Sequence, residues 1–210
     1  APMKVRIIAN PIAGGGRGKR LAEALRDTLN GNVDAVELVL TKQAGDNEIE
    51  AARPGADCVV AVGGDGSVNE VVNGLVDSDA LLAILPAGTA NVWAKEAGIP
   101  TSPEAALRDQ LRGETVVVDV GRADDRRFLL MASYGLDAKT VRTVGTRAKR
   151  WFGMFAYIVA GFRVGIRYPG FRLSVTFDDA PPEVVDATMV VVGNTRWYGS
   201  AARITSQASA

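Results

Sequence analysis

The chain has 210 residues, of which 47% are hydrophobic and 23% charged, and its 24 Lys and Arg residues balance 24 Asp and Glu residues. This composition supports a packed core in one large domain or two small ones, and the zero net charge argues against a nucleic-acid binder with a broad basic face. The chain has no histidine and a single cysteine, Cys58, which excludes a disulfide framework, a Cys/His zinc site and a Ser-His-Asp triad, and leaves acid–base chemistry to carboxylates, lysines or tyrosines.

The first half of the chain alternates short apolar runs with helical patterns. The predicted strands are 4–9, 33–40, 58–62 and 81–85. The predicted helices are one that follows the glycine loop 14–18 and runs through 29, and those over 48–52, 69–76, 91–97 and 103–111. Apolar strand interiors between helices are typical of βαβ units around a parallel sheet that is covered on both faces. Right-handed crossovers then bring the carboxyl ends of the strands to one edge, where open α/β sheets bind ligands.

Beyond about Thr115 the pattern changes to strand-like runs separated by turn residues. These runs are 127–134, 171–177 and 184–192, with one helical stretch over 148–165. We therefore predict an α/β fold with two domains, an N-terminal parallel-sheet domain over 3–118 and a β-rich, sandwich-like domain over 119–210.

The stretch VVAVGGDGSVNEV begins at Val59 and ends the third predicted strand on the glycine-rich sequence 63–66. Glycine at a strand end lets a ligand approach the backbone, and successive N–H groups beside a helix N-terminus can cradle anionic oxygens. Asp65 cannot attract phosphate itself, so we interpret it as a ligand for Mg²⁺ or as a proton acceptor near a transferred group. The alternative is a tight strand–helix turn in which Asp65 and Ser67 only cap the helix.

Two further glycine turns follow predicted strands. The sequence NPIAGGGRGKR, over 10–20, carries Arg17 and Lys19, which could neutralise phosphate charge or simply be solvated. The sequence LPAGTANVWA, over 85–94, follows the fourth strand. Neither the P-loop spacing nor a Gly-x-Gly-x-x-Gly dinucleotide fingerprint is present in these turns. Three glycine turns at one sheet edge nevertheless favour a site for nucleotide phosphates.

These motifs, in this order, resemble the catalytic domain of the diacylglycerol kinase and sphingosine kinase superfamily, including its bacterial soluble lipid kinases. The resemblance rests on Asn10-Pro11 with its glycine loop, on 63–66 followed by Asn69-Glu70, and on the Gly-Thr-Ala-Asn sequence 88–91. It covers the chain from 4 to about 204. The family has an α/β nucleotide-binding domain followed by a β-sandwich, with ATP between the two, and the resemblance implies this fold.

The resemblance also implies cofactors, ATP and Mg²⁺, and a set of site residues. The implied nucleotide-binding residues are Asn10, Thr41, Gly63, Gly64, Asp65, Gly66, Ser67, Gly88, Thr89 and Asn91. Asp65 is the implied metal ligand and, together with Asp137 in the sequence YGLDA, a candidate catalytic residue near the acceptor hydroxyl. We interpret Asp119 as a cap or a solvated side chain.

The chain departs from the family pattern at several positions. Ser67 stands for the usual threonine and keeps its hydroxyl, whereas Val92 stands where many members have an aspartate. The final segment, 202–210, lacks a proline that is common there, and the sequence ends before the Asp-Asp-Gly-x-Leu-Asp segment that completes the nucleotide and metal site in the family. We therefore expect the second, substrate-side domain to be incomplete at its C-terminus.

The function that the resemblance implies is that of an ATP-dependent lipid kinase. Such an enzyme transfers the γ-phosphoryl group to a lipid hydroxyl, for example that of diacylglycerol or a sphingoid base. Two alternatives stay open: a kinase of a soluble acceptor, similar to the NAD kinases, and a non-catalytic nucleotide-binding regulatory module.

The expected partners are a lipid substrate and, through the apolar segment WFGMFAYIVAGF over 151–162, a membrane surface contacted peripherally. The alternative for that segment is a helix that covers the sheet of the second domain. No signal peptide and no run of about 18 apolar residues is visible, so we expect a cytoplasmic location and no transmembrane segment. No nucleic-acid partner is expected, and a homo-oligomer is compatible with the sequence.

Overall fold

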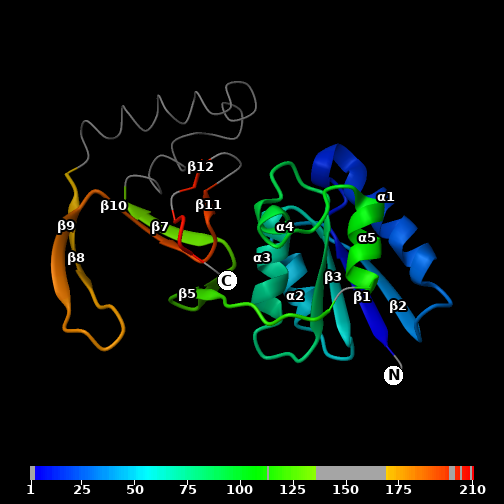
Figure 1. The fold of residues 1–210 in the computed structure, drawn as a ribbon. Helices are drawn as coiled ribbons and strands as arrows, with labels where there is room; N and C mark the ends of the chain where they lie inside the picture. The colour runs from blue at the N-terminus through cyan, green and yellow to red at the C-terminus, as the bar shows by residue number, and fades with distance from the viewer. Residues whose placement is uncertain (1–2, 113, 136–168, 199–201, 204, 209) are drawn as a thin grey trace. The chain divides into compact units, whose positions relative to one another are not determined.

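The computed structural model describes residues 3–112, 114–135, 169–198, 202–203, 205–208 and 210 (Figure 1). Two compact units can be distinguished: Ala1–Met131 together with Gly193–Ala210, and Ala132–Val192. The predicted domains, 3–118 and 119–210, divide the chain differently from these units and stay a prediction. The predicted helix over 148–165, the apolar segment 151–162 and Asp137 lie outside the described residues. In the described part of the chain, no helix has both the length and the apolar character needed to cross a membrane.

The first unit is built on a four-stranded sheet in the order β2-β1-β3-β4, in which neighbouring strands are parallel. The strands are β1 Lys4–Ala9, β2 Ala35–Leu40, β3 Cys58–Gly63 and β4 Leu81–Pro86. Ala9 lies opposite both Leu40 and Val62 in the ladder. Gly63 lies opposite Pro86, so the carboxyl ends of the strands are level at one edge. The predicted α/β fold with an N-terminal parallel sheet is confirmed.

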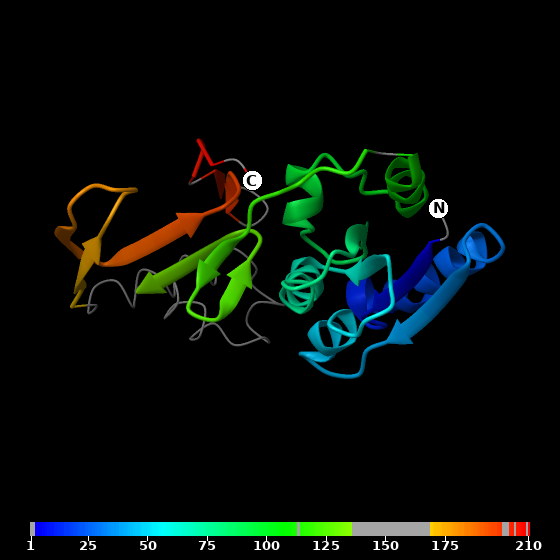
Figure 2. The same ribbon diagram turned by 90° about the horizontal axis from the view of Figure 1, so that it is seen from below.

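In the described part of the first unit, five helices cover the two faces of this sheet (Figures 1 and 2). They are α1 Ala13–Leu29, α2 Asp46–Ala51, α3 Asp65–Gly74, α4 Val92–Glu96 and α5 Pro103–Arg112. Alternate residues of a strand face opposite sides of a sheet, and the two cores follow that alternation. Ile7 of β1 shares a core with Leu25 of α1. Ile8 shares the other core with Val71 of α3 and Trp93 of α4, so the helices cover both faces.

Helix α3 begins earlier than predicted, at Asp65 instead of at 69. The Gly-Asp-Gly sequence therefore lies at the start of the helix, with Gly64 as an N-cap residue in extended conformation (φ −96°, ψ −175°). The prediction was wrong here because glycine disfavours a helix interior but is tolerated in the first turn, where N–H groups have no intrahelical partner. At the start of α1, by contrast, the glycines over 14–16 have left-handed backbone, so the regular helix begins only after them.

The remaining described strands form small two-stranded sheets. In the first unit they are the antiparallel pairs β5 Gly121–Ala123 with β6 Arg126–Phe128, and β11 Trp197–Tyr198 with β12 Ala202–Arg203. The other pairs are β7 Met131–Gly135 with β10 Met189–Gly193, and β8 Phe171–Val175 antiparallel to β9 Glu183–Ala187. The predicted runs 127–134 and 184–192 are thus each divided between two strands.

The run 127–134 is interrupted because side chains of α3 take up its backbone hydrogen bonds. Asn73 Oδ1 accepts from the N–H of Arg127 at 2.9 Å, and Asn69 Oδ1 accepts from the N–H of Leu129 at 3.0 Å. The side-chain amides of Asn69 and Asn73 both donate to the carbonyl of Arg127, at 3.2 and 2.9 Å. The two asparagines therefore satisfy backbone groups that a neighbouring strand would otherwise bind.

A buried arginine connects β1 to β2 and to the end of α2. Arg6 is 5% exposed, and its Nε donates to Oε2 of Glu37 at 2.7 Å. Its Nη1 donates to the carbonyls of Glu50 and Arg53, at 3.2 and 2.5 Å, and its Nη2 donates to the carbonyl of Pro54 at 3.2 Å. One guanidinium thus satisfies three backbone carbonyls at the end of α2 and in the turn that follows.

We expect Glu37 to contribute to a loss of stability in acid. The hydrogen bond from the Arg6 side chain, opposed by burial and supported by Arg53, holds the pKa of Glu37 below its ordinary value of 4.5. The unfolded chain then binds more protons, so this stabilisation is complete above pH 4.5 and is lost as the pH falls through the folded-state pKa. Urea unfolding at a series of acidic pH values should show that Glu37→Gln loses less stability on acidification than the parent. Parallel losses in the two proteins would contradict the prediction.

Candidate functional site

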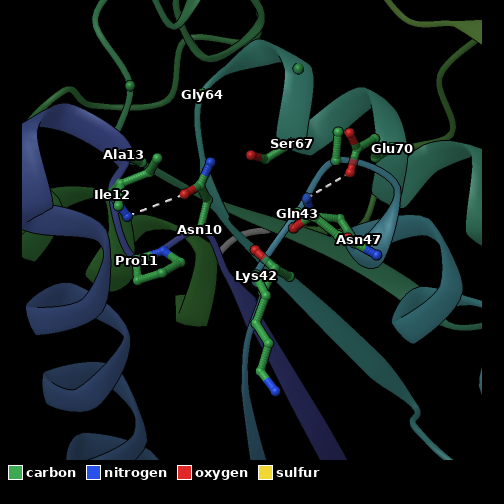
Figure 3. A pocket seen from close by; sticks show the side chains of 14 residues that line it. Asn10, Pro11, Ile12, Ala13, Lys42, Gln43, Asn47, Gly64, Ser67 and Glu70 are labelled. Atoms are coloured by element: carbon green, nitrogen blue, oxygen red, sulfur yellow. Dashed lines mark hydrogen bonds between the residues drawn. The ribbon is translucent and has the colours of Figure 1, made fainter.

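A cavity of about 470 Å³ lies at the carboxyl edge of the parallel sheet (Figure 3). Its lining comes from the segments after all four strands: Asn10, Pro11, Ile12 and Ala13 after β1; Thr41, Lys42, Gln43, Ala44 and Asn47 after β2; Gly64, Gly66, Ser67 and Glu70 after β3; and Gly88 after β4. A volume of this size suits a small-molecule ligand. The prediction that the three glycine turns meet at one edge of the sheet is confirmed.

The glycine turns pack directly against one another. The N–H groups of Ala87 and Gly88 both donate to the carbonyl of Gly63, at 2.9 and 3.2 Å. A Cβ atom on Gly88 would lie 2.5 Å from the Cα atom of Gly64, and one on Gly14 would collide with the carbonyl oxygen of Ala87. These glycines are therefore required by contacts between turns. The sequence did not predict these contacts between turns.

Gly66 differs from these glycines because a Cβ atom added to it would meet no atom within 4 Å. It lines the cavity from the first turn of α3, where helix N–H groups have no intrahelical partner. The N–H groups of Asp65, Gly66 and Ser67, together with the helix dipole, make this end of α3 electropositive. Open space and backbone donors suited to anionic oxygens therefore coincide at one point of the cavity wall.

Asp65 holds the next helix in place. Its Oδ1 accepts a hydrogen bond from the N–H of Trp93 at 3.0 Å, and Asp65 is not among the described residues that line the cavity. Trp93 lies in the first turn of α4, whose N-cap residue, Asn91, has left-handed backbone (φ 47°) and makes no side-chain cap bond. Asp65 therefore caps α4, and not its own helix as the alternative interpretation of the sequence assumed. This bond uses one of its two carboxylate oxygens.

The other predicted site residues fall into two groups. Asn10, Thr41, Gly64, Gly66, Ser67 and Gly88 line the cavity. Gly63 is buried at the end of β3, and Thr89 is exposed. The side chain of Asn91 closes its own turn, because its amide exchanges hydrogen bonds with the N–H and the carbonyl of Gly88 at 3.0 and 3.1 Å. The ligand contacts predicted for all of these residues stay predictions, and Asp137 lies outside the described residues.

Two of the lining side chains are bonded to backbone. The hydroxyl of Thr41, which is buried, donates to the carbonyl of Ala9 at 3.2 Å and so joins the ends of β1 and β2. Asn10 Oδ1 accepts from the N–H of Ile12 at 3.2 Å (Figure 3). Both bonds shape the turns at the sheet edge before any ligand is present.

Lys42 is the cation and Glu70 the anion among the described residues that line the cavity. Asp46 shapes the turn that carries Lys42, because its Oδ2 accepts from two backbone N–H groups of that turn, at 2.8 and 3.1 Å. These two bonds lower the pKa of Asp46 below its ordinary value. Arg17 and Lys19, the cations that the sequence suggested for phosphate, are not among these lining residues.

The sequence analysis did not find the pair formed by Asn47 and Glu70. Asn47 Nδ2 donates to Glu70 Oε2 at 2.7 Å, and both residues line the cavity (Figure 3). Asn47 is 4% exposed, and its Oδ1 is buried without a hydrogen-bond partner. Glu70 belongs to a motif quoted from the sequence, but nothing there indicated that its partner would come from another helix.

The resemblance also implies a Mg²⁺ ion, for which the structure offers few carboxylates among the described residues. Within the described residues, no group of three or more His, Cys, Asp or Glu side chains could hold a metal ion. A Mg²⁺ ion on nucleotide phosphates keeps several waters and needs only one or two protein carboxylates. Asp65 keeps one carboxylate oxygen that does not bond to Trp93, but it is not among the described residues that line the cavity, so its role as a Mg²⁺ ligand stays a prediction.

The family model described as the diacylglycerol kinase catalytic domain matches residues 4–123, a range that contains every residue lining the cavity. The chain belongs to this kinase family. The superfamily predicted from the glycine turns is therefore confirmed. A diacylglycerol kinase from Mycobacterium tuberculosis is 33% identical over 208 residues, which are 93% of this chain and 66% of the relative. A diacylglycerol kinase from Staphylococcus aureus is 30% identical over 83% of this chain and 57% of its own length.

Solved structures agree with the family assignment. A crystal structure of a protein assigned as a diacylglycerol kinase, from Bacillus anthracis, matches with a TM-score of 0.80 at 26% identity and covers 99% of this chain and 70% of that chain.

The chain spans 46% of another relative, from Synechocystis, which is 30% identical. It is thus about half to two thirds as long as the curated relatives it matches.

Proposed function

We propose that the cavity binds ATP and that the protein transfers the γ-phosphoryl group to a lipid hydroxyl, such as that of diacylglycerol or a sphingoid base. The observation that carries this proposal is the cavity formed after all four parallel strands, with Gly66 open in the first turn of α3. The diacylglycerol kinases among the relatives favour a lipid acceptor. The chain spans only part of these relatives, so both the activity and the acceptor of the whole protein are proposed here.

In this proposal the phosphates lie against the first turn of α3, where backbone N–H groups, the helix dipole and open space favour anionic oxygens. Lys42 adds positive charge to the same cavity. Phosphoryl transfer depends mainly on positioning and on neutralising charge, and such a cradle supplies both. Mg²⁺ would neutralise further charge on the phosphates, with Asp65 as its proposed ligand. Asp65 and Asp137 are the proposed candidates for the group that accepts the hydroxyl proton.

We expect the full-length protein to transfer label from γ-labelled ATP, with Mg²⁺ present, to one lipid of a total lipid extract. Asp65→Asn should reduce this transfer by about a hundredfold or more, because the carboxylate charge is lost. Asparagine keeps an oxygen that can accept from the N–H of Trp93, so α4 stays capped. A melting temperature close to that of the parent is the control for an intact fold.

The same assay distinguishes the alternatives. Binding of ATP without any labelled lipid would contradict the lipid-kinase proposal. Label in NAD or another soluble acceptor would then favour a kinase of a soluble substrate, and binding without transfer to any acceptor would favour a regulatory nucleotide-binding module.

A further inference from the structure

We infer that Arg196 and Glu96 form a positioning pair for phosphoryl transfer: they hold helix α4, and α4 holds the carboxylate of Asp65. The inference rests on the proposed function, in which Asp65 acts beside the transferred phosphate. Asp65 lies between two glycines that line the cavity, and its Oδ1 accepts from the N–H of Trp93 at 3.0 Å. A shift of the start of α4 therefore moves the N–H group to which this carboxylate is bonded.

Helix α4 depends on other segments for its position. It has five residues, whereas an isolated helix needs about 12–15 to be even marginally stable. The buried side chain of Trp93 packs in a core and secures one face of the helix. The two ends are held by side chains from elsewhere in the chain. Asp65 accepts from the first turn, and Arg196 donates to Glu96, the last residue of the helix.

The pair at the end of α4 uses both oxygens of the Glu96 carboxylate. Arg196 Nε donates to Oε1 at 2.7 Å, and the backbone N–H of Arg196 donates to Oε2 at 3.3 Å. The Glu96 side chain is 9% exposed, so loss of its partner would leave a buried charge uncompensated. The helix dipole also disfavours a carboxylate at this end of a helix. Arg196, which lies 100 residues further along the chain, therefore holds an end of α4 that would otherwise be unfavourable.

The segment that carries Arg196 is itself anchored, and it belongs to the first unit together with α4. Thr195 is 0% exposed, and the N–H groups of Asn194 and Thr195 both donate to the carbonyl of Leu130, at 2.8 and 3.2 Å. The side-chain amide of Asn194 donates to two further backbone carbonyls, at 2.7 and 3.0 Å. Arg196 follows directly after these bonds, so it offers α4 a fixed point of attachment.

Arg196→Gln is expected to lower kcat by about tenfold and to change the KM for ATP little, because a small misplacement of a reacting group slows transfer while the cavity wall stays in place. In the Asp65→Asn background the same change should cost little further activity, since no carboxylate charge is left to misplace. Arg196→Lys should keep most of the activity, because its ammonium group can still pair with Glu96. Assays of the full-length protein with γ-labelled ATP, Mg²⁺ and the lipid that the parent labels measure these effects.

Amide hydrogen exchange, followed by NMR, tests the same inference without nucleotide, metal or lipid. The amide of Trp93 should exchange about tenfold faster in Arg196→Gln than in the parent, while amides of β3 stay unchanged and so exclude a general loss of stability. Arg126→Gln is the matched control. Arg126 is 55% exposed and pairs with Glu48 of α2 at 2.7 Å, so this variant also removes an ion pair between distant segments. It should change neither the exchange of Trp93 nor kcat.

Unchanged exchange of Trp93 in Arg196→Gln would overturn the inference and leave the proposed function standing. Equal losses of kcat in the parent and Asp65→Asn backgrounds would also overturn it, because Arg196 would then not act through Asp65. If Arg196→Gln does not fold, Glu96→Gln takes its place, since it weakens the same pair without leaving a buried carboxylate unpaired. Absence of label transfer by the parent would overturn the proposed function together with the inference.

Discussion

Gly66→Ala is expected to bind ATP about tenfold or more weakly than the parent, the cost of one misplaced methyl-sized group in a fitted site. Its melting temperature should stay the same or rise. In the ligand-free protein the added Cβ atom meets no atom within 4 Å, and the backbone of Gly66 is not left-handed. Alanine in a helix is also favoured over glycine by about 0.5–1 kcal/mol, chiefly because it restricts the unfolded chain. With nucleotide present, the same methyl group would occupy space proposed for phosphate.

Calorimetric titration and thermal unfolding of the same samples measure these two effects. Gly88→Ala is the matched control, because its Cβ atom would lie 2.5 Å from the Cα atom of Gly64. That variant should melt at a lower temperature than the parent, with or without ATP. If Gly66→Ala binds ATP as tightly as the parent, the phosphates do not lie at the first turn of α3.

Arg6→Met is expected to lower the free energy of unfolding by about 1.5–3 kcal/mol, the range for losing hydrogen bonds to a charged group, because the Glu37 side chain is 41% exposed and keeps Arg53 as a partner. Methionine fills most of the space of the arginine stem, so the loss comes mainly from polar groups. Three backbone carbonyls, those of Glu50, Arg53 and Pro54, lose their donor, and Glu37 loses its buried partner. Urea unfolding at neutral pH measures the change.

Arg53→Met tests whether the stability that Arg6 contributes comes from its buried hydrogen bonds to carbonyls or from its ion pair with Glu37. Arg53 pairs with the same Glu37 at 2.8 Å, but its side chain is 46% exposed. Exposed ion pairs contribute about 0–1 kcal/mol, so this variant should lose far less stability than Arg6→Met. Similar losses in the two variants would show that pairing with Glu37, and not the buried bonds to the carbonyls, is what Arg6 contributes.

The parallel sheet was predictable because its signals are local. Apolar runs bounded by turn residues mark β1, β3 and β4, and each of these strands begins at its predicted residue. The carboxyl ends of parallel strands meet at one edge, so the meeting of the glycine turns followed from the strand assignments alone. Helix starts were harder to predict, because glycine in the first turn of α3 reads as a loop in the sequence.

The hydrogen-bond partner of Asp65 could not be predicted from the neighbouring sequence. The place of Asp65 after β3 suggested a metal ligand, a proton acceptor near a transferred group, or a cap of its own helix. In the structure its Oδ1 accepts a hydrogen bond from the N–H of Trp93, which lies 28 residues further along the chain. No spacing rule in the sequence indicates that partner, because it depends on how α4 packs beside α3.

The sequence by itself determined that this protein has a parallel α/β sheet, that its glycine turns share one edge, and which kinase family it belongs to. Only the tertiary structure decided that Asn47 pairs with Glu70, that Gly88 serves a contact between turns, and that Gly66 stays open to the cavity. The physical reason is the range of the interactions. Apolar periodicity and turn propensity act between near neighbours in the chain, whereas hydrogen-bond partners and free space depend on which distant segments the packed core brings together.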